Sequence, residues 1–319
     1  KRIGVKKLEA NIVCIGGGTG LPNLLRGLKK YSSNITAIVT VADDGGSSGV
    51  IRDELKILPP GDIKNCLLAL ADTEPLMEKL FQYRFKSGSL KGHSFGNLYL
   101  AAMTGILGDF ELAIKESSKI LAVRGRVVPS TLADVRIEAE YCDGSKVLGE
   151  SKIPGVNRKI KKIRLYPPDA EPLDEALDAI SNAEVIIIGP GSLYTSIIPN
   201  LLIKPLTECI SASSAKKIFI VNIMTQPGET SGYTAFDHVK AVIKHSNEDI
   251  IQYVVVNTEQ IPKHLLDIYR ADGSTPVLCD NEKIKKMGYN VVEGHVIDPT
   301  NVLRHSPSKL ANVLMSIIE

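Results

Sequence analysis

A glycine-rich segment at residues 16–20 has the composition of an anion-binding loop. Four glycines surround Thr19 there, between an apolar stretch at 11–15 and leucines at helical spacing from Leu21 onward. Glycine lets the main chain approach a phosphate, and free N–H groups at a helix start attract negative charge. Leu21 occupies the place of the last glycine of a dinucleotide fingerprint, and no P-loop Lys-Ser or Lys-Thr pair follows. We predict phosphate contacts from Gly17, Gly18, Thr19 and Gly20; a tight turn without a ligand is the alternative.

Two adjacent carboxylates, Asp43 and Asp44, follow the next apolar stretch at 35–41. Dinucleotide-binding proteins place an acid at this point to hold a ribose hydroxyl. Magnesium is a second interpretation, because this ion prefers oxygen ligands. The small residues at 45–49 are typical of another anion-binding loop, with Gly46, Ser47 and Ser48 as its candidates. The alternative is that one Asp only caps a turn.

Polar residues also mark the starts of two further predicted helices. Lys64 and Asn65 fall in the first turn of a helix over 63–71, where a cation is unfavourable for the helix dipole and an anionic ligand would explain it. A solvated lysine is the alternative. His93 and Asn97 flank another helix start, where they could bind a ligand or serve only as caps.

A later loop at 189–196 repeats the glycine and hydroxyl pattern after another buried apolar stretch. Parallel open sheets bind ligands outside the carboxyl ends of their strands, so we expect all these loops to converge on one crevice. The candidates that complete it are Gly189, Gly191, Ser192, Thr195, Lys204, Asn222 and Thr225.

The elements that must position these residues alternate between short β-branched stretches and helical patterns. This alternation predicts an α/β fold, a Rossmann-like, doubly wound and mostly parallel sheet, over a single domain of residues 1–319. A β-rich insertion is expected at 110–166, and a C-terminal docking helix with Ser306 as N-cap and Pro307 at its first position. The expected strands are Asn11–Ile15, Ile35–Val41, Glu184–Ile188, Lys217–Ile223, Ile251–Asn257 and Pro276–Cys279.

Composition excludes several classes of protein. In 319 residues, 44% are hydrophobic and 23% charged, which is typical of globular chains. The chain has 38 lysines and arginines and 36 aspartates and glutamates, which gives a net charge of +2. A charge so close to zero disfavours a nucleic-acid scaffold. The five scattered cysteines form no disulfide framework or zinc pattern. No apolar stretch approaches the roughly 20 residues of a bilayer helix, so we expect a cytoplasmic protein without a membrane span.

Six separated motifs together resemble a known family. They are GGGTGLP (16–22), VADDGGSSG (41–49), PPGDIKNCLLALAD (59–72), GHSFGNLYLAAM (92–103), GPGSLYTSIIPNLL (189–202) and NIMTQPGET (222–230). Their combination resembles the YvcK-type gluconeogenesis factors, which share a superfamily with CofD, the 2-phospho-L-lactate transferase. The resemblance runs from about Asn11 to Arg304.

The resemblance implies a cytosolic bacterial protein linked to gluconeogenic growth, and to cell shape through peptidoglycan synthesis. It implies a nucleotide-sugar ligand such as UDP-N-acetylglucosamine, with its diphosphate across the loops at 16–20 and 189–196 and a ribose hydroxyl on Asp43 or Asp44. Lys64, Lys204 and Asn222 are further candidate contacts. We therefore expect a regulatory binding protein rather than an enzyme. The resemblance leaves open a homo-oligomer and contacts with cell-wall synthesis or regulatory proteins.

The competing hypothesis is a CofD-like transferase, which moves a phospholactyl-type group from a nucleotide-activated donor with Mg²⁺. Asp43 or Asp44 would then stabilise the transferring group, with Asp44 as a metal ligand. The resemblance places Lys64 at the position where the transferases have a second carboxylate. A cation at this position repels a metal ion and attracts an anion. We therefore predict no definite cofactor, with Mg²⁺ as the alternative.

Overall fold

A seven-stranded parallel sheet forms the centre of the molecule. The computed structural model describes residues 8–72, 75–298 and 302–319. Central strands such as Ile12–Gly16 and Val185–Ile188 are buried along their whole length, as expected where helices cover both faces of a parallel sheet. In spatial order the strands are β10 (Asn290–Gly294), β9 (Tyr253–Asn257), β8 (Lys216–Ile220), β7 (Val185–Ile188), β1 (Ile12–Gly16), β2 (Ile35–Val39) and β3 (Arg126–Pro129).

The chain builds this sheet outward in two directions from its middle. Ile12 of β1 lies opposite Ile35 of β2 on one side and opposite Val185 of β7 on the other. Strands β2 and β3 extend the first side, and β8, β9 and β10 extend the second. The topological switch point therefore lies between β1 and β7. This arrangement confirms the predicted doubly wound, Rossmann-like α/β fold.

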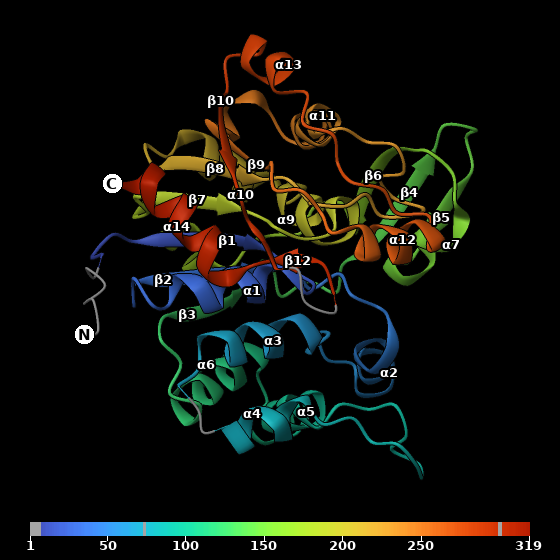
Figure 1. The fold of residues 1–319 in the computed structure, drawn as a ribbon. Coiled ribbons are helices and arrows are strands. Elements are labelled where there is room, and N and C mark those ends of the chain that lie inside the picture. The colour runs from blue at the N-terminus through green and yellow to red at the C-terminus, as the bar shows by residue number, and fades with distance from the viewer. Residues whose placement is uncertain (1–7, 73–74, 299–301) are drawn as a thin grey trace.

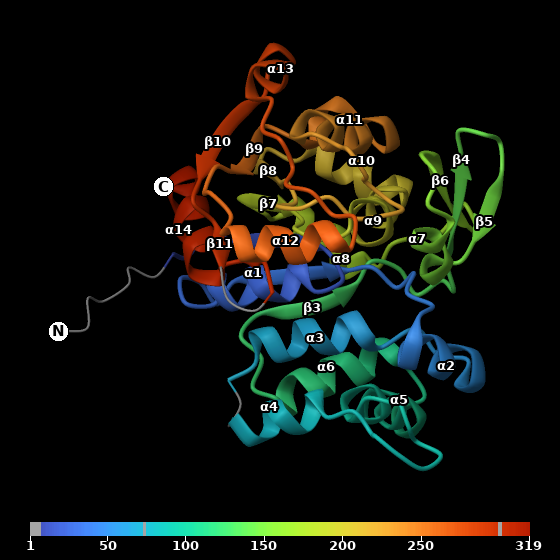
Figure 2. The same cartoon turned by 45° about the vertical axis from the view of Figure 1, so that its right-hand side comes forward.

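Helices surround the sheet and also form a separate group beyond one of its edges. In Figures 1 and 2, α3, α4, α5 and α6 gather beneath the β3 edge, while α11 and α13 lie toward the opposite edge. The helices are α1 (Gly20–Leu28), α2 (Gly46–Leu55), α3 (Gly61–Leu70), α4 (Pro75–Gln82), α5 (Phe95–Leu107), α6 (Phe110–Ile120), α7 (Ile153–Val156), α8 (Asp174–Ser181), α9 (Ile198–Leu201), α10 (Lys204–Ala212), α11 (Ala235–His245), α12 (Lys263–Ala271), α13 (Asn281–Lys286) and α14 (Pro307–Ile318). Short 3₁₀ turns occupy Glu150–Lys152 and Glu248–Ile250, and a π-helical turn occupies Leu193–Ile197.

The last helix, α14, docks against α1 as its sequence predicts. Ser306 is the N-cap and Pro307 takes the first turn, where its missing N–H has no helical partner to lose. Leu310 and Leu314 are fully buried on the face toward the core. Within the described segments, none of the helices is both long and apolar enough to cross a bilayer.

The small antiparallel sheet lies apart from the main one, at the right-hand side of Figure 1. It consists of β5 (Lys146–Leu148), β4 (Arg136–Tyr141) and β6 (Ile160–Tyr166), and β4 alternates between buried and half-buried side chains. Residues 110–129, the first part of the expected insertion, form α6 and the main-sheet strand β3 instead. A two-stranded ribbon pairs β11 (Ile297–Asp298) with β12 (Arg304–His305).

One expected strand is wrong. Pro276–Cys279 makes only an isolated bridge, between Pro276 and Met224, and the edge of the main sheet is β10. Proline lacks the N–H that a ladder requires, which explains why this apolar stretch does not extend the sheet. The single-domain organisation stays a prediction.

Candidate functional site

The two glycine-rich loops meet at the switch point of the sheet. The first loop follows β1 and leads into α1, and the second follows β7 and leads into the π-helical turn. A Cβ atom on Gly20 would lie 2.4 Å from the Pro190 carbonyl oxygen, so only glycine allows this approach. The Asn200 side-chain amide also donates a hydrogen bond to the Gly16 carbonyl (3.2 Å). The loops are therefore in direct contact at the carboxyl ends of adjacent strands, as the sequence predicts.

A crevice of ≈ 230 Å³ opens beside these loops. Of the predicted residues, Thr19, Gly20, Gly191, Ser192, Asn222 and Thr225 line it. The amides at Thr19 and Gly20 belong to the start of α1, where the first N–H groups of a helix have no partner within that helix. The structure thus brings candidates from three separate loops around one opening.

A series of side-chain hydrogen bonds links three residues that line the crevice. Asn222 donates to Gln226 (Nδ2···Oε1, 3.3 Å), and Gln226 donates to Ser192 (Nε2···Oγ, 2.6 Å). The Thr225 hydroxyl pairs with that of Thr275 (3.2 Å). These bonds fix the loop after β8 against the loop after β7, which pre-organises the polar lining.

Further lining residues of the crevice come from two segments without any sequence signal. They are Tyr269 of α12, and Arg304 and His305 of β12. Burial lowers the pKa of His305 to about 4, so its imidazole is neutral at pH 7. Arg304 is exposed and is the one permanent cation among the lining residues. It supplies the positive charge that an anionic ligand requires.

A second group of predicted residues gathers at the starts of α2 and α5. The Ser47 hydroxyl lies 3.3 Å from Nδ1 of His93, and the Asn97 amide donates to Ser47 (3.2 Å) and to Ser48 (3.4 Å). Two loops far apart in the sequence are therefore joined by their polar side chains. In this arrangement His93 and Asn97 hold α5 to α2, which is a structural role whether or not a ligand is present.

Lys64 is buried rather than solvated. Its ammonium group lies 3.5 Å from the Ser94 hydroxyl. Burial lowers the pKa of Lys64, and the nearby Arg84 guanidinium lowers it further, whereas Asp62 acts in the opposite direction. Asn65 is half-buried on the next position of α3. The placement of Lys64 inside the fold, near Asp62, removes the solvated alternative.

Asp62, which the sequence did not single out, connects the first loop to the second group. Its carboxylate accepts the Gly18 N–H (2.7 Å), so that amide is already bonded and is not free for a phosphate. Burial raises the pKa of Asp62 to about 6, against the opposing effect of this hydrogen bond, and the negative charge of Asp43 raises it further. Asp62 is thus a carboxyl group poised near neutral pH beside the first loop.

The two adjacent acids point in different directions. Burial raises the pKa of Asp43, which accepts the Gly45 N–H (2.9 Å) and interacts with Asp62. Asp44 instead accepts the Ser151 N–H (2.8 Å) from the 3₁₀ turn next to the antiparallel sheet. Asp44 therefore anchors that sheet, and Asp43 is the acid that faces the loops.

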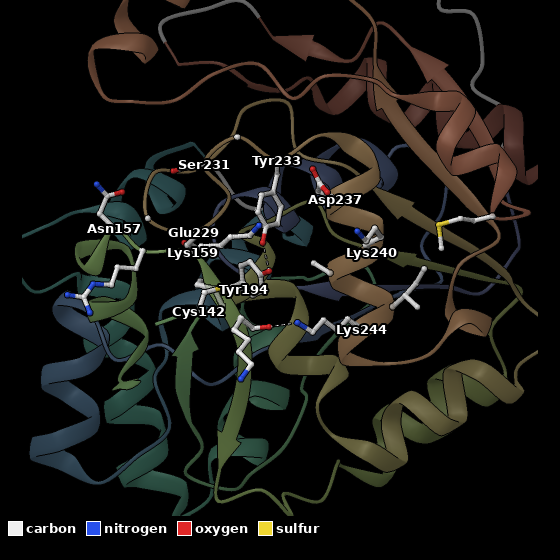
Figure 3. Close-up of a pocket in the computed structure, with 18 residues that line it drawn as sticks. Cys142, Asn157, Lys159, Tyr194, Glu229, Ser231, Tyr233, Asp237, Lys240 and Lys244 are labelled. Carbon is white, nitrogen blue, oxygen red and sulfur yellow. Dashed lines mark hydrogen bonds between the residues drawn. The ribbon is translucent and has the colours of Figure 1, made fainter. Parts of the chain in front are cut away.

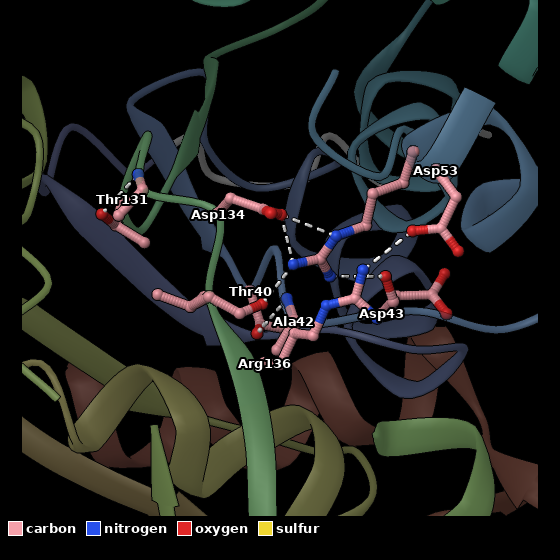
Figure 4. A network of polar contacts seen from close by, with 10 residues as sticks. Thr40, Ala42, Asp43, Asp53, Thr131, Asp134 and Arg136 are labelled. Carbon is pink, nitrogen blue, oxygen red and sulfur yellow. Dashed lines mark hydrogen bonds and ion pairs between the residues drawn. The ribbon is translucent and has the colours of Figure 1, made fainter. Parts of the chain in front are cut away.

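Arg52 of α2 fixes the backbone at Asp43. Figure 4 shows the polar network around this point, with Asp43, Asp134 and Arg136 labelled. Its side chain is 3% exposed and donates to the Asp43 carbonyl (3.2 Å), to the Val135 carbonyl (2.6 Å) and to the Asp134 carboxylate (2.8 Å). Arg136 pairs with Asp53 (2.8 Å) close by. This network ties the acidic loop to the strand that begins the antiparallel sheet.

Thr195 lies inside the fold between two carboxyl groups that the sequence also did not reveal. Its hydroxyl lowers the pKa of both Glu150 and Glu229, against the larger effect of burial. Burial raises the pKa of each to about 7, and the charges of Asp43 and Glu229 contribute at Glu150. Glu229 is 6% exposed, and its Oε2 has no hydrogen-bond partner among the described residues.

Three more of the predicted residues do not line the crevice. Lys204 is exposed on α10 and pairs with Glu208 (3.6 Å). Gly46, at the start of α2, is also exposed. Gly189 is buried at the end of β7 and shapes the second loop without lining the crevice.

The donor set limits how Mg²⁺ could bind. Over residues 8–72, 75–298 and 302–319, no three His, Cys, Asp or Glu side chains converge as a metal site. Magnesium bound together with phosphates needs only one or two carboxylates, and Asp43 with Asp62 could supply them. Asp44 does not fit this role, because its carboxylate is turned toward Ser151.

Comparisons with known proteins agree with this architecture. The model of the family described as 2-phospho-L-lactate transferase CofD matches residues 12–297. The gluconeogenesis factor of Bacillus subtilis is 52% identical over 313 residues, which cover 98% of this chain and 99% of that protein. The gluconeogenesis factor of Halalkalibacterium halodurans is 50% identical over 309 residues, 96% of each chain. A crystal structure of a UPF0052 family member from Bacillus halodurans has a TM-score of 0.94 and 49% identity, and covers 96% of this chain and 99% of that one.

Proposed function

The chain belongs to the CofD family, among its gluconeogenesis factors, and from that premise we propose that it binds a nucleotide sugar and acts as a regulatory protein in gluconeogenic metabolism. One observation carries the proposal: the two glycine-rich loops contact each other beside a polar crevice, and that crevice is lined by one arginine. A UDP-N-acetylglucosamine-like ligand fits this chemistry, and a role in cell shape and peptidoglycan synthesis belongs to the same proposal.

The diphosphate is the part of the ligand that the crevice suits best. Main-chain N–H groups at Thr19 and Gly20 supply donors at a helix start, and Arg304 supplies the matching charge from the same lining. The Ser192 hydroxyl also lines the crevice and accepts a hydrogen bond from Gln226. At ≈ 230 Å³ the crevice is smaller than the roughly 300–1,000 Å³ of most ligand pockets, so the base or the sugar extends beyond it.

Calorimetry with UDP-N-acetylglucosamine tests this proposal. Arg304→Gln removes a charged hydrogen-bond donor to phosphate, so we expect a loss of about 1.5–3 kcal/mol, or roughly 10- to 150-fold in affinity. Arg270→Gln is the matched control, because Arg270 is an exposed arginine on α12 that does not line the crevice. Equal affinity of both variants and the unchanged protein would overturn the placement, and the absence of any binding would overturn the ligand class.

A transferase is the second candidate function, and the closeness of two acids, Asp43 and Asp62, whose charges act on each other, favours it. A bound Mg²⁺ would supply charge stabilisation to a transferring group. Asp43 and Asp62 would hold it, while Lys64 nearby would attract the anionic donor. Product formed from a guanylylated donor and a hydroxyl acceptor, and lost in Asp62→Asn, would establish this function over the regulatory one.

A further inference from the structure

A second and larger cavity lies between the antiparallel sheet and α11, away from the crevice (Figure 3). Its volume is ≈ 660 Å³, within the range of about 300–1,000 Å³ that is usual for small-molecule sites. One wall comes from Cys142 and residues 157–161 beside β6, and the other from residues 228–233 and α11. No residue that lines the crevice also lines this cavity.

The two walls are held rigidly against each other. Gly228 has a φ of +78°, and a Cβ at this position would lie 2.0 Å from the Pro154 carbonyl oxygen. The loop therefore packs on the turn of α7 through its bare backbone. The Lys244 ammonium also donates to the Lys161 carbonyl across the gap. The cavity is thus formed by fixed elements of the fold and does not depend on a loose surface loop.

Aromatic side chains form the base of the cavity. The Tyr194 and Tyr233 hydroxyls are hydrogen-bonded to each other (2.8 Å), and their rings meet edge to face with centroids 6.3 Å apart. Both tyrosines line the cavity, where Tyr194 is 3% exposed and Tyr233 is half-buried. Such a base suits a planar or carbon-rich body of a ligand.

Positive charge surrounds this base. Five cations line the cavity, Arg158, Lys159, Lys161, Lys240 and Lys244, against two carboxyl groups, Glu229 and Asp237. The excess of three positive charges exceeds the net charge of +2 of the whole chain. Asp237 is engaged in capping α11 through Thr234. The cavity therefore concentrates positive charge in a chain that is otherwise nearly balanced.

Two lysines on opposite walls are the best placed to hold an anion. Lys159 makes no side-chain hydrogen bond or ion pair within the described segments. Lys240 on α11 only lies over the Phe236 ring, with its ammonium 5.2 Å from the centroid. Arg158 and Lys161 are instead paired with Asp143 (2.6 Å) and Glu140 (2.7 Å). Lys159 and Lys240 are thus available to a ligand without breaking an ion pair.

We propose that this cavity binds a small phosphorylated metabolite, with its phosphate between Lys159 and Lys240 and its body against Tyr194 and Tyr233. Lysine recognises phosphate as a point charge, and the excess of positive charge in the cavity favours an anion there. This site is separate from the crevice and does not depend on the function proposed for it.

Reductive labelling with pyridoxal 5′-phosphate tests the proposal directly. This probe carries a phosphate on a planar ring, and its aldehyde forms an imine with lysine that borohydride traps. We expect peptide mapping to find the label on Lys159 or Lys240 in preference to Lys204, whose side chain is 85% exposed. Pyridoxal, which lacks the phosphate, should not show this preference, and excess glucose 6-phosphate should suppress it. Labelling in proportion to lysine exposure, or equal labelling by pyridoxal, would overturn the proposal.

Variants provide the second arm of the test. Lys159→Gln and Lys240→Gln change exposed side chains, so both proteins should fold, and we expect each to weaken protection by glucose 6-phosphate at least tenfold. Lys204→Gln is the control and should leave protection unchanged. Labelling in Arg304→Gln should also be unchanged, which separates this cavity from the crevice. Protection unaffected in both cavity variants would contradict the assignment.

Discussion

Glu229 gives the sharpest prediction about stability. This carboxyl group is 6% exposed and one of its oxygens has no hydrogen-bond partner in the described chain, so its charged form is poorly solvated. Burial raises its pKa from 4.5 to about 7. A raised folded pKa means that the native state holds this proton more tightly than the unfolded chain. The stability that it contributes is fully present below pH 4.5 and is lost as the pH rises through about 7.

The magnitude follows from the two pKa values. At about 1.4 kcal/mol per pH unit, the interval between 4.5 and about 7 corresponds to about 3 kcal/mol of unfolding free energy. Most of this loss, about 2–3 kcal/mol, falls between pH 5 and pH 8. The variant Glu229→Gln is neutral at every pH and should not show this part of the decline. Its own amide lacks an acceptor, which costs about 1–3 kcal/mol at all pH values.

Urea unfolding at pH 5 and pH 8, followed by circular dichroism, measures the effect. Relative to the unchanged protein, Glu229→Gln should gain about 2–3 kcal/mol between pH 5 and pH 8. Glu150 titrates in the same region and faces Glu229, so its pKa should fall in the variant and act in the same direction. Glu208→Gln, on a 63% exposed glutamate, is the control and should stay within about 0.5 kcal/mol. Equal losses of stability in Glu229→Gln and the unchanged protein would refute the reasoning.

Three further substitutions test contacts described above, and a fourth, at Gly105, is a control. Gly20→Ala should force the two loops apart, because its Cβ would lie 2.4 Å from the Pro190 oxygen; we expect a lower thermal midpoint and at least a tenfold loss of UDP-N-acetylglucosamine affinity by calorimetry. Gly105→Ala, where a Cβ meets open space, should be neutral or stabilising by up to about 1 kcal/mol. Arg52→Ala should lower the unfolding free energy by about 2–4 kcal/mol in urea, since it removes donors to two backbone carbonyls and a carboxylate. Leu310→Ala should cost about 2–5 kcal/mol in the same assay because it opens a cavity beneath α14. An unchanged urea midpoint in either of the last two would show that the network or the helix docking contributes little.

Local sequence pattern was enough to predict the centre of the sheet but not its edges. Strands such as β1 and β7 are buried on both faces and read as continuous apolar stretches. The edge strands carry no such pattern: β3 has only four residues, and the side chains of β10 are mostly half-buried or exposed. The stretch at 276–279 resembles a strand in composition. Pro276 lacks the N–H that a sheet ladder requires, so composition alone gave a wrong strand there.

The candidate site divides in the same way. Loops that follow buried strands are recognisable because glycine and hydroxyl residues replace an apolar pattern, and parallel strands bring those loops to one edge. Arg304 and Glu229 could not be found in this way. Arg304 lies in a segment without a motif, and Glu229 lies in the motif at 222–230, which gives no sign of its role. Only the folded chain brings Arg304 to the crevice and Glu229 to Thr195. The raised pKa of Glu229 likewise depends on burial, which no local pattern of residues encodes.

The segment between β8 and α11 has a consequence for how two ligands would influence each other. Asn222 and Gln226 in its first half line the crevice, and Glu229 and Tyr233 in its second half line the larger cavity. A molecule that shifts this strip of backbone from one side changes the shape offered to the other. Thermodynamic linkage then requires the effect to be reciprocal. If a sugar phosphate changes the affinity for UDP-N-acetylglucosamine by some factor, UDP-N-acetylglucosamine changes the affinity for the sugar phosphate by the same factor. The response of such a chain to one metabolite would then depend on the concentration of the other.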